Sequence, residues 1–270
     1  MTKAFSLASW NVEHFKEANS RVERVIAFLK SVNPDVFALY EVEGKEVFAE
    51  LSTAMPSYQF HITEGPQVQE ILVGVRQGLT AFFTQKLEFK AGNPSLRPGA
   101  LLTITVAGTH YPILFLHTKS GPKPIGWGIR DDMLERALKF KNVLKKSGDG
   151  SEPNYIFLGD LNTMGMNYLI KKYNIPADEE LQKLDTVAKK YGMRRLTKTS
   201  PYTWWNGPQS GIAPSNLDQV VAAQHLRFAQ FGGQDVSVRG WPEQPTDQAK
   251  GVWIKDYSDH GLLYLEVQKA

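Results

Sequence analysis

Cysteine is absent from all 270 residues of the sequence. Its absence excludes disulfide bonds, catalysis by a thiol and a zinc site built from thiolates. A metal ion would have to bind carboxylates, amides, carbonyl groups, water or one of the six histidines. The compartment stays open on this evidence, because secreted proteins can also lack cysteine.

Long apolar segments and a strong net charge are missing too. No apolar run approaches the roughly 18 residues that a membrane-spanning helix needs, and the first residues enter a strand-like pattern without the features of a signal peptide. We therefore expect a cytoplasmic protein with no membrane span, and secretion is the alternative. The 31 basic and 28 acidic residues leave a net charge of +3, which is too small to indicate nucleic-acid binding by itself.

What is present is the composition of an ordinary globular protein. Hydrophobic residues make up 42% of the chain and charged residues 22%, which is enough apolar material to bury a substantial core. The chain has no low-complexity tract and no long Gly/Ser linker. We expect residues 1–270 to form a single domain and the protein to be a monomer.

Strand-like and helix-like patterns alternate along the chain. Period-two or continuous apolar patterns predict strands over residues 4–10, 35–41, 70–76, 79–85, 100–106, 111–117, 154–160, 216–223 and 260–267. Apolar residues at helical spacing predict helices over residues 19–31, 44–55, 133–144 and 179–192. Helices between strands favour layers, and several strands in succession argue against a purely parallel sheet. The expected fold is a four-layer α/β sandwich, with two mixed β-sheets packed face to face and helices outside.

Many of these apolar strands end in residues that bind metals or move protons. These residues are Asn11, Glu41, His117, Asp160, Asn162, Asp218, Asp259 and His260. Strand ends at one edge of a sheet form a rigid platform on which binding and catalytic groups are often placed. Turns also favour Asp and Asn for local hydrogen-bonding reasons, so any single position could be a simple turn former. Their repetition predicts a shared catalytic edge.

The motifs that carry these residues resemble those of the endonuclease/exonuclease/phosphatase superfamily, also called DNase I-like. The segments "SWN", "YE", "HTKS", "GDLNT", "NLDQV" and "SDH" occur in the family's order from Asn11 to His260. The resemblance implies a two-sheet α/β sandwich with a divalent-metal site at one edge. It also implies a phosphodiester hydrolase that depends on Mg²⁺ or Mn²⁺.

The resemblance assigns a role to each position. Glu41 would be the main metal ligand, because a carboxylate suits the oxygen preference of Mg²⁺ and Mn²⁺. Asp259 would be a second acidic ligand at the same site. The Asn11 amide would lie near the metal and the substrate. The alternatives without a functional role are an exposed glutamate at Glu41 and a turn residue at Asn11.

The water and the phosphate would be handled by a second group of residues. Asp160 would orient or deprotonate the attacking water, and Asn162 would hold its position and contact the phosphate. His260 would contact the phosphate oxygens and stabilise charge in the transition state. Asp218 would hydrogen-bond to His260, fix its tautomer and favour the imidazolium form. An ordinary turn is the alternative for Asp160 and for Asp218.

Two further positions follow from the same resemblance, and Trp127 is a candidate because of its own surroundings. His117 would bind phosphate and could protonate the leaving group, with Glu70 or Gln69 orienting its ring. Arg97 would contact a phosphate bidentately, with a structural salt bridge as the alternative. Trp127 lies among glycines in the segment 117–132, which suggests a mobile loop whose Trp stacks on a base; a solvated loop with an anchoring Trp is equally compatible.

The substrate is less well specified by the sequence. The leading hypothesis is a nuclease that cleaves DNA or RNA by metal-assisted attack of water. The first alternative is a phosphatase or phosphodiesterase acting on a small-molecule or lipid phosphoester. A non-catalytic binding scaffold is a third alternative, although the complete set of acids argues against it. Glu43 stands where DNase I-like members carry an arginine, which weakens a close analogy with that subgroup.

Overall fold

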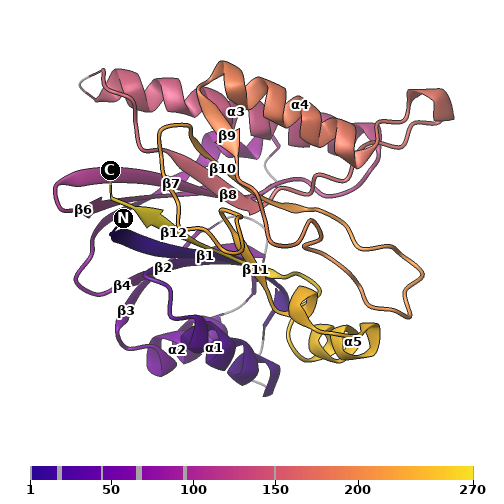
Figure 1. The fold of residues 1–270 in the computed structure, drawn as a ribbon, viewed down its shortest axis with the longest axis horizontal. Coiled ribbons are helices and arrows are strands. Elements are labelled where there is room, and N and C mark those ends of the chain that lie inside the picture. Colours follow the sequence, from indigo (N-terminus) through magenta and orange to yellow (C-terminus); the bar gives the residue numbers. More distant parts are fainter. Residues whose placement is uncertain are drawn as a thin grey trace.

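Two six-stranded β-sheets form the centre of the molecule (Figure 1). The computed structural model describes residues 2–16, 20–43, 45–64, 69–93, 96–148 and 150–269. In order across the first sheet, the strands are β11 (Ser237–Arg239), β12 (Leu262–Gln268), β1 (Lys3–Phe15), β2 (Val36–Val42), β4 (Glu70–Arg76) and β3 (Tyr58–Ile62). The second sheet consists of β5 (Thr80–Lys86), β6 (Gly99–Val106), β7 (Thr109–His117), β8 (Ile156–Asp160), β10 (Asp218–Ala223) and β9 (Met193–Arg195).

Helices cover the outer face of each sheet, so the molecule has four layers (Figure 1). The first sheet packs against α1 (Ser20–Val32), α2 (Lys45–Ala54) and α5 (Asp247–Asp256), and the second against α3 (Pro124–Ser147) and α4 (Ala177–Lys190). Short 3₁₀ helices are η1 (Leu87–Lys90), η2 (Lys171–Tyr173) and η3 (Trp241–Glu243). The predicted sandwich of two mixed sheets is confirmed. No helix within the described ranges is both long and apolar enough to cross a membrane.

The central strands are apolar on both faces because they are covered on both sides. In β8, Ile156 and Leu158 join the core between the sheets, whereas Phe157 points outward into the core under α3 and α4. In β1, Leu7 lies between the sheets and Trp10 lies under the helices of the first sheet. Alternate side chains of a strand point to opposite faces, so a strand in a middle layer must be apolar at nearly every position.

One pair of parallel strands lies at the centre of each sheet, and these strands end where the candidate site residues lie. This end of the sheets is called the functional edge below. The pairs are β1 with β2 and β7 with β8, and their neighbours run antiparallel. His117 and Asp160 are register partners at the ends of β7 and β8, and Asp218 is the partner of Asp160 at the start of β10. Parallel strands end at the same edge and an antiparallel neighbour begins there. Strand ends that are far apart in the sequence therefore meet.

Some sequence-based boundaries were wrong. Helix α3 begins at Pro124, so Trp127 is helical and the predicted mobile loop around it is not found. Proline suits the first turn of a helix, and Gly126 is there because a Cβ would come within 2.6 Å of the Gly121 carbonyl oxygen. Strands β3, β9 and β11 and helix α5 were not expected. The first residues of the helices predicted from 19 and 44 lie outside the described residues.

Gly159 allows the two sheets to pack closely at the functional edge. Its φ of +145° is a conformation that side chains rarely adopt, and a Cβ there would lie 2.0 Å from the Leu116 carbonyl oxygen and 2.8 Å from the Tyr40 hydroxyl. Tyr40 in β2 donates a hydrogen bond of 3.3 Å to the Leu158 carbonyl of β8. Only glycine lets β8 approach β2 and β7 closely enough to place Asp160.

Gly159→Ala should therefore reduce the free energy of unfolding by about 3 kcal/mol, because the added methyl meets rigid backbone. Urea denaturation measures the change. The control is Gly128→Ala in α3, where a Cβ meets nothing within 4 Å. That control should gain about 0.5–1 kcal/mol, since alanine is the better helix former. A stable Gly159→Ala protein with wild-type activity would contradict this account of the edge.

Candidate metal and phosphate site

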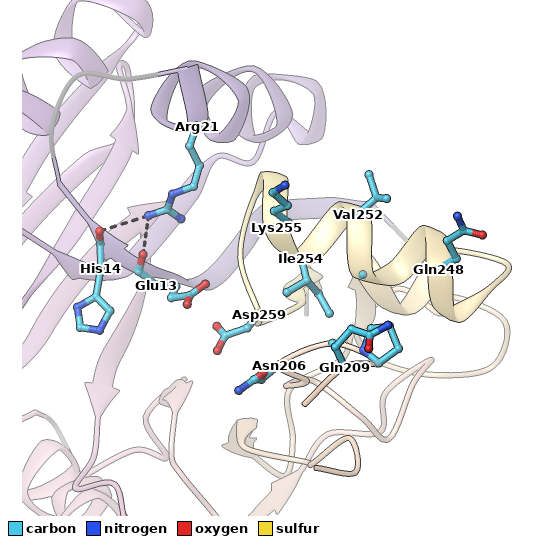
Figure 2. Close-up of a pocket in the computed structure, with 13 residues that line it drawn as sticks. Glu13, His14, Arg21, Asn206, Gln209, Gln248, Val252, Ile254, Lys255 and Asp259 are labelled. Atoms are coloured by element: carbon cyan, nitrogen blue, oxygen red, sulfur yellow. Dashed lines mark hydrogen bonds between the residues drawn. The ribbon is translucent and has the colours of Figure 1, made fainter. Parts of the chain in front are cut away.

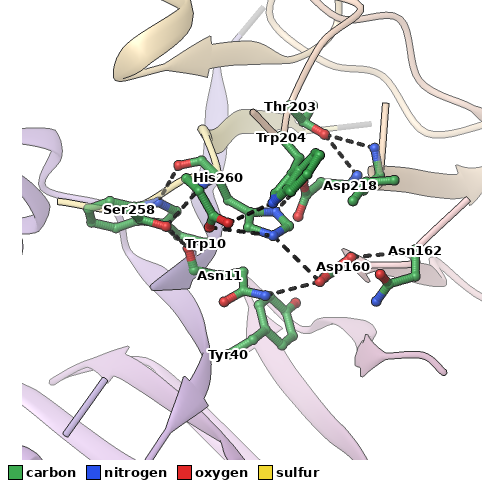
Figure 3. Close-up of polar contacts among 12 residues, drawn as sticks. Trp10, Asn11, Tyr40, Asp160, Asn162, Thr203, Trp204, Asp218, Ser258 and His260 are labelled. Atoms are coloured by element: carbon green, nitrogen blue, oxygen red, sulfur yellow. Dashed lines mark hydrogen bonds and ion pairs between the residues drawn. The ribbon is translucent and has the colours of Figure 1, made fainter. Parts of the chain in front are cut away.

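Asp160 lies at the centre of the polar residues that the two sheets bring together (Figure 3). Its Oδ2 accepts a hydrogen bond of 3.0 Å from the Asn11 amide and lies 3.4 Å from Nε2 of His117 and 3.8 Å from Nε2 of His260. Its Oδ1 accepts the backbone N–H of Asn162 at 3.1 Å. One buried carboxylate thus lies close to residues from β1, β7 and the segment just before β12.

Asn11 connects this carboxylate to the first sheet. The Asn11 amide also donates to Oε1 of Glu41 at 3.1 Å, and its carbonyl oxygen accepts the backbone N–H of Glu13. Glu41 Oε1 in turn lies 3.8 Å from Nε2 of His117. In this arrangement the oxygen of Asn11 is engaged by the backbone, and its amino group orients two acidic side chains.

His260 and Asp218 form a buried pair on the other side of Asp160. Nδ1 of His260 lies 2.8 Å from Oδ2 of Asp218 (Figure 3). Burial opposes the charged imidazolium, but the attraction of Asp218 and Asp160 outweighs it and raises the pKa of His260 well above its usual value. The ring is a cation held with its Nε2 edge toward Asp160.

Burial shifts the pKa values of two other central groups. It raises the pKa of Asp160 to about 7, with the charges of Asp218 and Glu41 acting in the same direction and His260 opposing them. It holds the pKa of His117 well below its usual value, reinforced by the positive charges of Arg97 and His260. His117 is therefore neutral in this site, and Asp160 can exchange a proton near neutral pH.

Asp259 is adjacent in sequence to His260 but faces a different partner. Its Oδ2 accepts the indole N–H of Trp204 at 2.6 Å, and burial raises its pKa. Among the residues that the structure describes, its buried Oδ1 has no hydrogen-bond partner. An orphaned carboxylate oxygen at this position is a free ligand for a cation.

The cluster fits a divalent cation that prefers oxygen ligands. Ligand atoms of Glu41, His117 and Asp160 all lie within 4.8 Å of one another. Asp160, Asp218 and His260 meet the same criterion, but Nδ1 of His260 is already bonded to Asp218 and the ring is charged. The first group is therefore the better place for a cation, with Glu41 as the main ligand, because a carboxylate suits Mg²⁺ or Mn²⁺.

Backbone strain accompanies this cluster. Glu41 and Asn162 have positive φ values of 61° and 49°. Glutamate is seldom found in this region, and such conformations collect at functional sites. At Asn162, a residue type that adopts this region readily, the turn aims the backbone N–H at Asp160 and lets the side-chain amide donate to the Thr118 carbonyl at 3.2 Å. The turn expected for "GDLN" is therefore present, and it positions the catalytic candidate.

Arg97 reaches the site indirectly. Its guanidinium donates to the backbone and side-chain oxygens of Gln69, and the Gln69 amide lies 3.4 Å from Oε2 of Glu41 and 2.9 Å from Nδ1 of His14. We expected Gln69 or Glu70 to orient the His117 ring, but neither residue forms a hydrogen bond with Nδ1 of His117. Nδ1 of His117 has no hydrogen-bond partner in the described part of the chain, and Glu70 accepts the hydroxyl of Thr63.

Arg130 and Trp127, which follow His117 in the sequence, lie on α3 and have their partners outside the cluster. Arg130 is buried and forms two hydrogen bonds with Glu180, at 2.7 and 3.0 Å. Trp127 lies on α3 with the ammonium of Lys183 4.8 Å from its ring centroid. Base stacking by Trp127 stays a prediction, and the ring is already partly covered by α4.

Three supporting residues were not found from the sequence. Thr203 is buried, and its hydroxyl accepts the backbone N–H of Asp218 at 2.9 Å. Ser258 donates to the Asn11 carbonyl at 2.7 Å and accepts the N–H of His260 at 3.1 Å, which ties β1 to the "SDH" turn. Trp204 anchors Asp259. Hydroxyl and indole groups carry no local pattern that reveals such partners; only the serine of "SDH" lies within a motif.

A cavity of about 1030 Å³ opens beside the cluster (Figure 2). Asp259 and Glu13 lie at its inner end, and the segment 206–209 and one face of α5 form its walls. Three residues with amide side chains are among those that line it, namely Asn206, Gln209 and Gln248. The cavity reaches the cluster at Asp259.

Comparison with known proteins places the chain in a family. The model of the "Endonuclease/Exonuclease/phosphatase family" matches residues 8–260, which include every residue of the cluster. The chain belongs to this family. It is therefore a phosphoester hydrolase of the endonuclease/exonuclease/phosphatase type, as the motifs indicated. No curated protein matches it significantly in sequence.

Solved structures share the fold at low identity. Truncated TDP2 from Caenorhabditis elegans is 16% identical, with a TM-score of 0.69 over 98% of both chains. D. rerio TDP2, solved with a single-strand DNA product, is also 16% identical, with a TM-score of 0.67 over 98% of this chain and 99% of the other. A mannosyl-6-phosphatase from Bacteroides thetaiotaomicron is 14% identical, with a TM-score of 0.61 over 98% and 100%. These likenesses establish the architecture of this family member.

The raised pKa of Asp160 predicts that the metal-free protein becomes less stable as pH rises. The folded state keeps a proton up to about pH 7 that the unfolded state releases near pH 4. The contribution of Asp160 to stability therefore falls as pH rises from about 4 to 7. In EDTA at pH 8, Asp160→Asn should be more stable than wild type by on the order of 2 kcal/mol, and the gain should shrink at pH 5.

Asp235→Asn provides the matched control in urea denaturation. Burial tends to raise the pKa of Asp235, but its hydrogen bonds with Arg194 and Gln230 prevail and lower it. Its stabilising contribution is present above pH 4 and is lost as pH falls through the folded pKa. Asp235→Asn should destabilise the protein at pH 8. A loss of stability in both variants at pH 8 would show that burial of the Asp160 carboxylate does not destabilise the folded protein.

Proposed function

We propose that the protein is a Mg²⁺- or Mn²⁺-dependent phosphodiesterase that cleaves nucleic acid. The observation that carries the proposal is the position of Asp160. It lies between the carboxylate-rich cation site of Glu41 and the protonated His260, within 4 Å of the nearest ring nitrogens. A base, a cation site and a fixed positive charge converge on one small volume, as phosphoester hydrolysis requires.

Glu41 would hold the metal ion, with Asn11 orienting the carboxylate and Asp259 adding negative charge. The bound ion would supply charge neutralisation of the phosphate and polarisation of its P–O bonds. The chain's own part is to keep these acids in place. Asn11 does so through hydrogen bonds of 3.1 and 3.0 Å to Glu41 and Asp160.

Asp160 would accept the proton of the attacking water. Its pKa of about 7 suits that role, because a general base works best when its pKa lies near the operating pH. The N–H of Asn162 fixes Oδ1, so Oδ2 is the oxygen that faces the reaction. The Asn162 side chain would hold the water and a phosphate oxygen at the same corner.

His260 and His117 would contact the phosphate from two sides. The imidazolium of His260 would stabilise the negative charge that grows on the phosphate oxygens, and Asp218 keeps it protonated and oriented. His117 is neutral in the metal-free site, so its ring would act first as a hydrogen-bond donor to phosphate. Any role as the acid for the leaving group would need the phosphate charge to raise its pKa.

Nucleic acid is the favoured substrate because of the surroundings of the site. The loops that follow β7 and β8 start at this edge and carry Lys119, Lys123, Lys171 and Lys172, and D. rerio TDP2, which has this architecture, was solved with a DNA product. A small phosphoester is the second candidate. The amide-lined cavity beside Asp259 supports it, since amides and carboxylates hydrogen-bond well to hydroxyl groups.

The decisive experiment compares hydrolysis of plasmid DNA, single-stranded DNA, RNA and bis-p-nitrophenyl phosphate with Mg²⁺, Mn²⁺ or EDTA. Turnover should require the metal, and His260→Ala should lower kcat by about 10²- to 10³-fold, as the loss of a transition-state contact does. The control is His225→Ala, which alters a histidine bonded to Asn154 away from the cluster. Activity on small esters alone would favour the second candidate, and no hydrolysis of any substrate would refute the proposal.

Metal binding can also be measured without turnover. Adding Mn²⁺ at about 100 times its Kd should raise the free energy of unfolding of wild type by about 2.7 kcal/mol. Glu41→Gln should lose most of this gain, whereas Glu50→Gln on α2 should keep it. Equal stabilisation of the two variants would exclude Glu41 as a ligand.

A further inference from the structure

The chain between β8 and α4 forms a projecting arm near the proposed site. Met166 and Ile175 pair through backbone hydrogen bonds of 2.7 and 2.9 Å, and residues 168–173 form the tip between them. Figure 1 shows this segment extending past the end of α4, on the side opposite the chain termini. Residues 166–175 are called the arm below.

The root of the arm is held by a buried ion pair. Glu180 accepts the backbone N–H of Gly165 at 2.7 Å, and its partner Arg130 donates to the Gly165 carbonyl at 2.9 Å. Both side chains are buried. The N–H of Asn167 also donates to the Pro122 carbonyl at 2.6 Å, which joins the arm to the loop after His117. The arm is therefore built as a fixed projection.

The tip exposes side chains that soluble proteins usually cover. Leu169 is 98% exposed, Ile170 53%, Tyr173 52% and Tyr168 41%. The two tyrosine rings pack edge to face with centroids 5.8 Å apart, and the ammonium of Lys172 lies 4.9 Å from the centroid of Tyr173. Clustered exposed apolar groups mark an interaction site. With the tyrosines engaged together, the two aliphatic side chains are free for a partner.

The three loops that meet at the functional edge carry only positive charge, whereas Asp178 and Glu179 are exposed in the first turn of α4, just after the arm. Segments 118–123, 163–176 and 200–217 follow His117, follow Asp160 and precede Asp218, so all three start or end at the functional edge. Together they contain the four lysines Lys119, Lys123, Lys171 and Lys172 and no acidic residue. Such a surface complements a polyanion that continues beyond the scissile phosphate.

We propose that the arm binds the strand of nucleic acid that flanks the scissile phosphate. Lys171 and Lys172 neutralise backbone phosphates, and Leu169 and Ile170 insert beside or between bases as an apolar wedge. The inference rests on the proposed function. Leu169 is seven residues from Asn162, so its contacts lie within about 25 Å of the site, or roughly seven nucleotides along a strand.

The test uses two double variants and two matched controls. Lys171→Gln/Lys172→Gln removes the charge of the tip, and Leu169→Ser/Ile170→Ser removes its apolar surface. Lys189→Gln/Lys190→Gln alters two exposed lysines at the last turn of α4, about 20 Å along that helix from the arm. Val143→Ser replaces an apolar residue that is 52% exposed in the last part of α3.

Substrate length separates the arm from the catalytic residues. Each protein is assayed with a 20-nucleotide DNA, a dinucleotide and bis-p-nitrophenyl phosphate. Wild type should show kcat/KM that rises with length, and both arm variants should lose about tenfold on the 20-mer relative to bis-p-nitrophenyl phosphate. The lysine variant should also lower the slope of log(kcat/KM) against log salt by roughly 1.4 to 1.8, for two lost phosphate contacts.

The outcomes distinguish this inference from the proposed function. If wild type cleaves the 20-mer and the arm variants match the two controls, the inference is wrong while the nuclease assignment stands. If wild type hydrolyses only small esters, both are wrong. If the arm variants cleave DNA normally but no longer sediment with phosphatidylcholine/phosphatidylserine vesicles that bind wild type, the arm contacts a membrane surface, and the nucleic-acid inference is overturned.

Discussion

The burial of the Asp160 carboxylate is the constraint on which the rest of the site depends. A buried carboxylate is costly unless its oxygens are bonded, and here one oxygen is bonded to the Asn162 backbone and the other to the Asn11 amide. The two sheets must therefore meet closely at this edge. Gly159 permits the approach, since a side chain there would strike the Leu116 carbonyl and the Tyr40 hydroxyl. The geometry of the site therefore depends on the close packing of the two sheets.

The same burial separates the protonation states of neighbouring groups. His260 gains more from Asp218 and Asp160 than it loses by burial and stays charged, whereas His117 faces Arg97 and His260 and stays neutral. Two histidines within reach of one aspartate thus acquire different roles from their surroundings. The positive φ of Glu41 and Asn162 adds local strain at the same place. A fold with three hydrophobic cores can tolerate this cost, and a bound cation would offset part of it.

Much of the fold could be predicted from the sequence because the central strands carry a strong local signal. Segments such as "YIFLGD" are covered on both faces, so they are apolar at nearly every position. Short edge elements such as β9 and β11, with three residues each, carry too little pattern to be detected. The start of α3 was missed because glycines next to Trp127 were interpreted as flexibility, whereas Gly126 is needed for close packing against Gly121. Local composition does not distinguish these two uses of glycine.

By itself the sequence determined the set of chemical groups: the acids, amides and histidines at strand ends, in the order of a known family. Only the tertiary structure decided how they are combined. Asn11 and Asp160 are 149 positions apart, and their hydrogen bond depends on two sheets packing at a set distance. Arg130 follows the candidate His117 closely in the sequence, yet it is bound by Glu180 and supports the root of the arm. Residue type limits what a side chain can do, and burial and neighbours, which depend on long-range packing, select among those possibilities.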